Sequence, residues 1–341
     1  MTDFEVRAKE RLPDYVWSYY SATAGAASDA EGIADWSGIR LRPYVLRDVS
    51  SIDTATSVLG TPVRTPILIA PMAQQAAAHP DGEAAMARAA AAEGGLLGVS
   101  TNAAVPFASV AAEGAPWWFQ VYVARDRRLT ELLVKRAVEH GAVALLLTVD
   151  MATLFRGTVN PRNWAEVPGK ARLGNLTAEE LAAAEPDGKF TDRTVGFEII
   201  EWLHKLSDLP IVVKGVLRGD DALRCVDAGA AGILVSTHGG RRLGSSISSA
   251  KALREVVAEV GARAEIYVDS GLRSGEHVAA ALAMGARAVF LGRPHLWALA
   301  AAGTEGVRTV LSGLTAELAL VMKQLGVSRL DQLTENLLAE P

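Results

Sequence analysis

Residues 232–243 read GILVSTHGGRRL, and this stretch decides the expected fold. A short apolar run ends at Ser236 and Thr237, and one histidine, two glycines and two arginines follow without a gap. We interpret the run as a buried strand that carries His238 and Arg241 to a rim, where glycines let the backbone turn sharply. A base beside a cation that can hold a carboxylate indicates chemistry on an anionic substrate. A strand followed by a solvated basic turn is an alternative interpretation of the same residues.

Seven more short apolar runs resemble this one, and alanine-rich, helix-like segments separate them. The eight runs are ILIA (67–70), LLGVS (96–100), WFQVYV (118–123), VALLLTV (143–149), IVVKG (211–215), GILVS (232–236), EIYVD (265–269) and AVFLG (288–292). Continuous apolar strands that alternate with helices indicate a parallel sheet covered by helices. Eight of them predict an α/β fold of the closed (β/α)8 TIM-barrel type. An open doubly wound sheet is the alternative, but no GxGxxG follows an early strand.

One barrel domain spanning residues 1–341 accounts for the length, because such barrels commonly exceed ~250 residues. We expect three additions to it: an N-terminal helical cap within 1–65, an active-site loop at 151–193, and C-terminal helices within 294–341. In the last segment the pattern predicts helices at Thr309–Leu325 and Leu330–Leu338. The 151–193 loop follows the fourth strand, so it lies on the face where barrel enzymes place their sites.

Composition excludes several classes of protein. The net charge is −5 and the basic residues are spread along the chain, so no nucleic-acid surface is expected. Cys225 is the single cysteine, which rules out a disulfide framework and a cysteine-based metal cluster; we expect no metal. The charged N-terminus lacks the apolar centre of a signal peptide, and no apolar run reaches the ~18 residues of a membrane span. A soluble, cytoplasmic protein is expected.

Polar residues gather at the carboxyl ends of the eight runs. They include Ser100, Gln120, Tyr122, Thr148, Asp150, Lys214, His238, Arg241, Asp269, Arg273 and Arg293. In a barrel these ends converge on one mouth, where barrel enzymes place their active sites. The sequence therefore predicts a single site built by all the strands.

Three local patterns sharpen this prediction. The strings DSGLRSG and LGRP combine glycine amides with Arg273 and Arg293 on the last two strands, where barrels commonly bind phosphate. Lys214 ends an apolar strand, and if buried it needs a partner such as a ligand oxyanion or a flavin ring edge; a surface lysine is the alternative. Asp269 could pair with His238 and raise its basicity, although an aspartate in such a turn is often only a turn residue.

At this point the chain resembles the FMN-dependent 2-hydroxy-acid oxidase/dehydrogenase family, which includes glycolate, lactate and hydroxymandelate oxidases. The resemblance covers nearly the whole chain. It rests on the strings LPDYVWSYY, RPYVLRDVS, ILIAPMA, HPDGE, QVYVARD, LLLTVD, PIVVKG, HGGR, DSGLRSG and LGRP. It implies FMN as cofactor and oxidation of a 2-hydroxy acid to the 2-oxo acid, with electrons passed to oxygen or another acceptor. It also implies a homotetramer.

The resemblance assigns roles by position. It implies flavin-ring contacts from Ala70, Pro71, Met72, Ala73, Ser100, Gln120, Thr148 and Lys214. It implies ribityl and phosphate contacts from Asp269, Gly271, Arg273, Gly292 and Arg293. His238 then matches the catalytic base, Arg241 the substrate-carboxylate anchor, and Tyr122 and Tyr19 further substrate contacts. Lys214 would stabilise the reduced flavin, and Asp269 would also face His238.

The chain departs from the family pattern around the substrate. A second substrate arginine is usual where Gly157 stands, so either Arg156 takes that role or Arg241 holds the carboxylate alone. Thr237 replaces an asparagine, and Arg242–Gly244 replaces Gln-Leu-Asp. Met72 stands where threonine is common, and Asn102 stands where an aromatic pocket residue is frequent.

These departures predict a specialised substrate, for example aromatic, mandelate-like or from secondary metabolism. One alternative is a member with altered or lost oxidase activity that acts as a flavin-binding protein. Another is a barrel that binds a different phosphate-bearing ligand.

Overall fold

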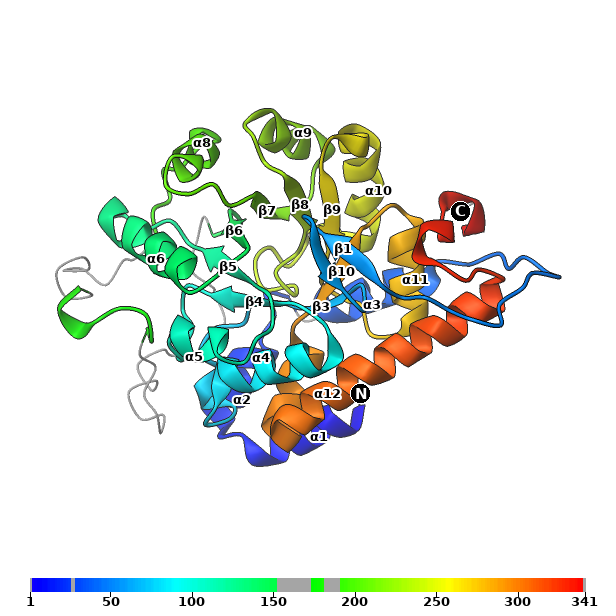
Figure 1. Cartoon of the computed structure of the whole chain (residues 1–341), viewed down its shortest axis with the longest axis horizontal. Coiled ribbons are helices and arrows are strands. Elements are labelled where there is room, and N and C mark those ends of the chain that lie inside the picture. The colour runs from blue at the N-terminus through cyan, green and yellow to red at the C-terminus, as the bar shows by residue number, and fades with distance from the viewer. Residues whose placement is uncertain (1, 26–27, 152–172, 181–190, 340–341) are drawn as a thin grey trace.

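The eight apolar runs form one closed parallel barrel in the computed structural model (Figure 1). The structure describes residues 2–25, 28–151, 173–180 and 191–339. Neighbouring strands pair in chain order from β3 to β10, and β10 closes the barrel on β3. The strands are β3 (Ile67–Ile69), β4 (Leu97–Ser100), β5 (Trp117–Val121), β6 (Ala144–Thr148), β7 (Ile211–Val216), β8 (Gly232–Val235), β9 (Glu265–Val268) and β10 (Ala288–Leu291). The TIM-barrel prediction is confirmed.

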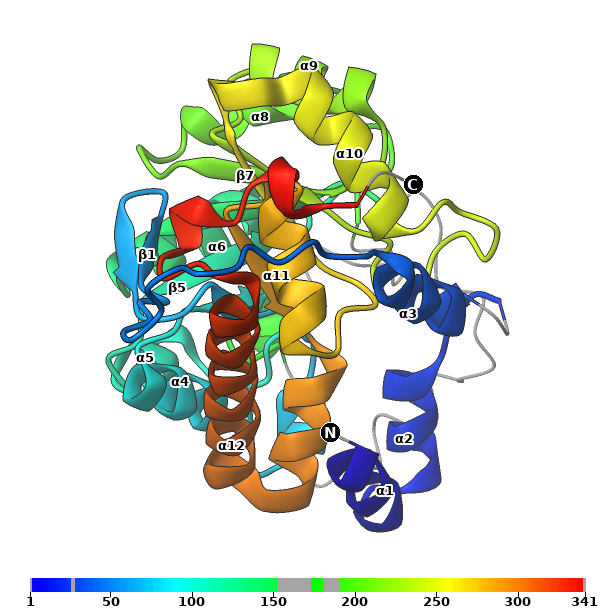
Figure 2. The same ribbon diagram turned by 90° about the vertical axis from the view of Figure 1, so that its right-hand side faces the viewer.

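Helices surround the barrel (Figures 1 and 2), and all of those named next except η3 share an apolar cluster with the outer faces of the strands. They are η1 (Gln75–Ala77), α4 (Gly82–Glu93), α5 (Phe107–Ala111), α6 (Arg127–Glu139), α8 (Glu198–His204), α9 (Gly219–Asp227), α10 (Ser249–Val260), η3 (Gly261–Arg263), α11 (Gly275–Ala283) and α12 (Arg293–Leu325). Side chains of Asp126, Ser248 and Ser274 cap α6, α10 and α11 by accepting hydrogen bonds from free backbone N–H groups.

A second apolar cluster fills the barrel interior and closes the end at which the strands begin. Trp118, Tyr267 and Phe290 pack against one another there, with ring centroids 5.2–6.0 Å apart. Val58 and Val63 join them from a hairpin, β1 (Thr56–Val58) and β2 (Thr61–Val63). This hairpin plugs the end opposite the strand carboxyl termini, so it lies away from the mouth. It falls within the 1–65 segment expected to be helical, where alternating burial favours strands.

Three N-terminal helices, α1 (Thr2–Arg11), α2 (Asp14–Ser21) and α3 (Ser28–Gly38), are anchored beside the mouth. Trp17 of α2 stacks on Trp297 with ring centroids 4.6 Å apart. The hydroxyl of Tyr20 donates to the backbone oxygen of Gln74 over 2.7 Å, and the indole of Trp36 donates to that of Ser270 over 3.0 Å. These contacts fix α2 and α3 against the loops that follow β3 and β9.

The C-terminal segment differs from its expected helices. Helix α12 begins at Arg293, directly after β10, and continues to Leu325 across a kink at Ala302 and Gly303. It packs between α1, α4 and α11 (Figure 2). The expected helix at Leu330–Leu338 is wrong: two 3-10 turns, η4 (Leu330–Gln332) and η5 (Glu335–Leu337), stand there, because Thr334 between them has an extended backbone.

Most of the expected 151–193 loop, and with it Arg156, lies outside the described residues.

Candidate active site

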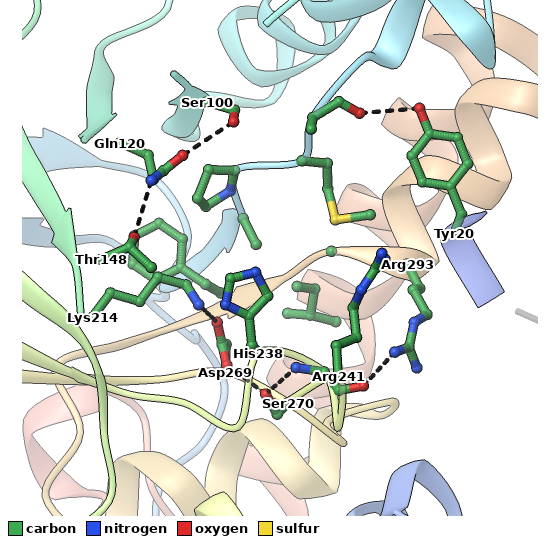
Figure 3. Close-up of a pocket in the computed structure, with 18 of the residues that line it drawn as sticks. Tyr20, Ser100, Gln120, Thr148, Lys214, His238, Arg241, Asp269, Ser270 and Arg293 are labelled. Atoms are coloured by element: carbon green, nitrogen blue, oxygen red, sulfur yellow. Dashed lines mark hydrogen bonds and ion pairs between the residues drawn. The ribbon is translucent and has the colours of Figure 1, made fainter. Parts of the chain in front are cut away.

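The strand ends surround one pocket at the mouth of the barrel (Figure 3). Apart from Arg156, every residue to which the sequence assigned a role in the site lines this pocket. They are Tyr19, Ala70, Pro71, Met72, Ala73, Ser100, Asn102, Gln120, Tyr122, Thr148, Lys214, His238, Arg241, Asp269, Gly271, Arg273, Gly292 and Arg293. Tertiary structure therefore brings the predicted set together, as the convergence of parallel strands requires.

His238 reaches the pocket through an unusual backbone conformation. His238, Gly239 and Gly240 have φ angles of 55°, 68° and 71°, so three successive residues occupy the left-handed region. Glycine adopts this region at little cost, whereas histidine is strained there. The hydroxyl of Ser236 supports the turn by accepting from the His238 backbone N–H over 3.0 Å. The glycines of the HGGR string thus serve the turn that places the imidazole.

The imidazole of His238 is held by Asp150, at the carboxyl end of β6. Its Nδ1 lies 2.9 and 3.0 Å from the two carboxylate oxygens. Burial lowers the pKa of His238 to about 4, against the opposing effect of Asp150. For Asp150, the effect of burial is outweighed by His238, Lys214 and Arg242, which lower its pKa to about 2. At neutral pH, therefore, Nδ1–H donates to an ionised Asp150, and Nε2 carries a lone pair suited to a base.

Asp150 had no assigned role from sequence, which placed it only at the end of the fourth strand. Gly215 is the sequence feature that could have pointed to a role for Asp150. Its φ is 103°, and a Cβ atom built on it would lie 2.7 Å from Cβ and Cγ of Asp150. The pairing of β7 with β8 is also irregular between Lys214 and Val216. The glycine in the VVKG string therefore makes room for the Asp150 side chain.

Lys214 and Asp269 form a buried ion pair. Nζ of Lys214 lies 3.1 Å from Oδ2 of Asp269 and donates to Oγ of Ser236 over 2.8 Å. Lys214 is 4% exposed and Asp269 6% exposed, so each charge needs the other. The suggested pairing of Asp269 with His238 is replaced by this contact, because β7 brings Lys214 to Asp269 while β6 brings Asp150 to the histidine.

A chain of neutral polar side chains lies beside Lys214 along one side of the pocket (Figure 3). Ser100 donates to Oε1 of Gln120 over 3.0 Å, and Nε2 of Gln120 donates to Thr148 over 3.1 Å. These three side chains come from β4, β5 and β6 and are all buried. The chain fixes the orientation of the Gln120 amide. With Lys214, it gives one side of the pocket a polar edge of known donors and acceptors.

Arg241 stands on the other side of His238 from Lys214 (Figure 3). Its guanidinium lies 4.8 Å from the ring centroid of Tyr19, which is a cation–π distance. Burial raises the pKa of the Tyr122 phenol, so this hydroxyl stays protonated and can donate. The base is thus flanked by a cation and a hydroxyl that can both bind an oxygen-rich substrate.

Two more arginines lie at the far end of the pocket. The guanidinium of Arg293 donates to the backbone oxygen of Gly239 and contacts Asp29 of α3, with 2.8 Å between Nη1 and Oδ2. Nη2 of Arg273 lies 3.2 Å from the same oxygen. Gly271, with a φ of 87°, permits close packing of this loop on Gly32, 2.7 Å from the position of a Cβ. The arginines are placed for a phosphate, and Asp29 is the anion that they contact in this structure.

A barrel mouth that holds a buried neutral histidine, an arginine beside it and two further arginines at its far end is typical of an enzyme for an anionic substrate with a phosphate-bearing cofactor. The chain matches the FMN-dependent dehydrogenase family over residues 8–340. It belongs to that family and is an FMN-dependent enzyme.

Curated relatives agree with this assignment. L-lactate oxidase of Nostoc sp. is 42% identical over 98% of this chain and 96% of its own length. Glycolate oxidase 5 of Oryza sativa subsp. japonica is 40% identical over 98% and 94% of the two chains. Among solved structures, a soluble mutant of the (S)-mandelate dehydrogenase of Pseudomonas putida superposes with a TM-score of 0.90 at 32% identity, covering 100% and 99% of the two chains. Mandelate oxidase with (S)-2-phenylpropionate gives 0.89 at 35% identity, covering 97% and 96%.

The residues at the mouth fit FMN. Gly292 leaves room beside Met72, since a Cβ there would lie 3.0 Å from the sulfur. Lys214 and the Gln120 chain offer donors and acceptors of the kind that the pyrimidine edge of a flavin needs. Arg273 and Arg293 supply two guanidinium groups for the phosphate.

Proposed function

We propose that this protein oxidises a 2-hydroxy acid to the 2-oxo acid, with FMN accepting the two electrons. The observation that carries this proposal is the neutral His238, which is hydrogen-bonded through Nδ1 to Asp150 and lines a pocket that also contains Arg241. This arrangement supplies a base and a carboxylate anchor within one cavity.

The side chains divide the work as follows. Arg241 holds the substrate carboxylate, and Tyr122 and Tyr19 contact its oxygens. His238 takes a proton from C2 or from the hydroxyl, and Asp150 stabilises the imidazolium that forms. Asp269, which neutralises Lys214, keeps this lysine charged in a buried position. The order of proton and electron transfer is left open between a carbanion and a hydride route.

The cofactor contacts are also part of the proposal. Ala70 to Ala73, Ser100, Gln120, Thr148 and Lys214 would contact the flavin ring. Gly271, Arg273, Gly292 and Arg293 would hold the ribityl and phosphate groups, with Asp269 orienting Lys214 between the two regions. When bound, FMN supplies the redox step, and the protein positions the substrate over it.

We further propose a specialised substrate, aromatic or otherwise bulky. Asn102 lines the pocket at a place that is often aromatic in the family pattern, and an amide there changes the shape and polarity of the wall. The likeness to mandelate oxidase and mandelate dehydrogenase structures supports an aryl group. Whether Arg156 adds a second anchor stays a prediction.

Anaerobic mixing of the FMN-loaded protein with glycolate, L-lactate and (S)-mandelate tests both parts. Bleaching of the visible flavin absorbance by a hydroxy acid supports the oxidation. Fastest bleaching by glycolate or lactate would remove the specialised substrate while keeping the reaction. Peroxide formed in air identifies oxygen as the acceptor; its absence during turnover indicates another acceptor.

A flavin-binding protein without oxidase activity is the second candidate. In that case none of a wide panel of 2-hydroxy acids bleaches the flavin, although the preparation is yellow. The intact His238–Asp150 pair favours the enzyme.

The homotetramer and the cytoplasmic location stay predictions. Val45 and Leu46 are exposed at 78% and 102%, and such apolar side chains support association with another copy. Light scattering of the purified protein tests the assembly. No helix within the described ranges is long and apolar enough to cross a bilayer.

A further inference from the structure

Arg242 contacts His238 at Nε2, the nitrogen that has to accept the proton in the proposed reaction. It follows Arg241 in the turn after β8, and its Nη2 lies 3.2 Å from Nε2 of His238. Because Nδ1 of His238 donates to Asp150, Nε2 has a lone pair, and the guanidinium can only donate to it. In this structure, then, Arg242 covers the lone pair of the base. An imidazole nitrogen has a single lone pair, so His238 accepts a proton only after Arg242 leaves.

The other nitrogens of the Arg242 guanidinium have no acceptor among the residues that the structure describes. Its Nε and Nη1 are buried and have no hydrogen-bond partner within the described part of the chain. A buried N–H without an acceptor costs free energy, and more so on a charged group. Arg242 lines the pocket beside Arg241. An anion in the pocket would satisfy these donors.

Among the described residues, the groups around this contact do not supply that anion. Asp150, after β6, is engaged by His238, and Asp269, after β9, is engaged by Lys214. Tyr122, which follows β5, and Tyr19 from α2 are phenols, and Arg241 and Lys214 are cations. The local charge therefore favours an incoming carboxylate.

Guanidinium geometry links carboxylate binding to the base. A carboxylate binds a guanidinium at two points through Nε with Nη2 or through Nη1 with Nη2. Both arrangements use Nη2, the atom that now contacts His238. Nη2 carries two N–H groups, so the arrangement that uses the one directed at Nε2 forms only after that contact breaks. A charged acceptor also forms a stronger hydrogen bond than a neutral imidazole.

We propose that Arg242 is a second carboxylate-binding residue, and that its transfer from His238 Nε2 to the substrate carboxylate exposes the base. The hydrogen bond from Nη2 to Nε2 breaks, one from Nη2 to a carboxylate oxygen forms, and no proton moves in this step. The base is thus uncovered when an acid is bound. This inference rests on the proposed function, because it assigns the substrate-binding role of the same pocket.

Binding of 2-oxo acids tests the anchor without turnover. Benzoylformate and pyruvate are titrated into FMN-loaded wild type, Arg242→Gln and Arg254→Gln, and the change in visible flavin absorbance gives Kd. Arg254 is an exposed residue of α10, so Arg254→Gln is the matched control. We expect Arg242→Gln to weaken binding by about 10- to 100-fold, as for loss of a hydrogen-bonded charge, and the control to match wild type. An unchanged Kd in Arg242→Gln overturns the anchor.

The pH profile tests the covering of the base. Loss of Arg242 removes a donor to Nε2 and a nearby cation, and both favour neutral His238. In Arg242→Gln the acid limb of kcat/KM for flavin reduction should move to higher pH. A purely structural role would lower activity without moving this limb, and an unmoved limb overturns the covering.

If Arg242→Gln does not bind FMN or does not fold, a third variant takes its place in the binding test. Arg242→Lys keeps the charge and removes both two-point arrangements, so binding should still weaken at least severalfold; wild-type Kd would overturn the anchor. The proposed function fails separately. If wild type binds the 2-oxo acids through Arg242 but no hydroxy acid bleaches its flavin, the oxidation is wrong and the anchor stands.

Discussion

Nδ1 of His238 lies 2.9 Å from a carboxylate oxygen of Asp150, which joins the turn after β8 to the end of β6 across the barrel mouth. The pair is largely shielded, with the two side chains 21% and 12% exposed. Because the carboxylate can only accept a hydrogen bond, it keeps the imidazole proton on Nδ1. The lone pair that can act as a base is therefore on Nε2. The catalytic proposal depends on this contact.

Asp150→Asn should reduce the rate of flavin reduction by about 10²- to 10³-fold, because an amide cannot stabilise the imidazolium by charge. KM should change far less, since Asp150 contacts His238 and not Arg241, the residue proposed to bind the substrate carboxylate. Stopped-flow reduction at saturating hydroxy acid measures the rate. The FMN content of the variant serves as the control for folding. A rate within threefold of wild type would refute the role of Asp150.

Gly215→Ala should destabilise the protein and displace Asp150. Its Cβ would lie 2.7 Å from Cβ and Cγ of Asp150, and its φ is 103°. Gly141→Ala is the matched control, because Gly141 also has a positive φ, 80°, but open space around it. We expect the free energy of unfolding to fall by about 1–2 kcal/mol in the control, because of the backbone conformation. In Gly215→Ala it should fall by a further ~1–3 kcal/mol.

Urea unfolding gives these free energies. Equal losses in the two glycine variants would show that Asp150 needs no room from Gly215. A reduced rate of flavin reduction in Gly215→Ala alone would connect the β7 irregularity to the base.

Asp29→Asn should tighten FMN binding. The Asp29 carboxylate contacts Arg273 and Arg293 at 3.2 and 2.8 Å, so it competes with a phosphate for both. Removing its charge should lower the Kd for FMN by about fivefold, the scale of a partly exposed ion pair. Quenching of free-FMN fluorescence during titration of apoprotein measures this Kd.

Asp35→Asn is the control for the Asp29 variant. Asp35 lies on the same helix but pairs with Lys251, so its loss should leave the Kd for FMN unchanged. Weaker FMN binding in Asp29→Asn would mean that the aspartate positions the arginines instead of competing.

Acid should destabilise the protein partly through His295. This buried residue donates from Nδ1 to the backbone oxygen of Leu291, and burial lowers its pKa to about 4. The unfolded histidine titrates near 6.5, so it binds more protons than the folded one between pH 6.5 and 4. Stability is therefore full above pH 6.5 and falls toward pH 4, by up to about 3 kcal/mol for this group.

Glu83 acts in the opposite direction over part of this range. Burial raises its pKa to about 6, so its contribution to stability is present below about pH 4.5 and is lost as the pH rises through 6. His295→Asn isolates the histidine, because Glu83 is unchanged in it. Urea unfolding at pH 7 and pH 4 should show a smaller acid loss in the variant; an equal loss would exclude His295.

Sequence by itself determined the barrel and most of the residues at its mouth. Eight apolar runs with helices between them leave few alternatives, and the ends of parallel strands must meet on one face. Lys214, His238 and Arg241 could be placed there because each follows a run that has to be buried. The hairpin at 56–63 was not found because its strands are only three residues long and alternate weakly.

Only the tertiary structure decided which charges pair. Asp150 and Asp269 follow different strands, and the sequence alone does not distinguish their partners. In the barrel, Asp150 contacts His238 and Asp269 contacts Lys214. The same holds for Arg242 on Nε2 of His238 and for Asp29 on the two distal arginines. Strand order places a residue at the mouth, but partner choice depends on side-chain direction within a few ångströms, which sequence spacing does not encode.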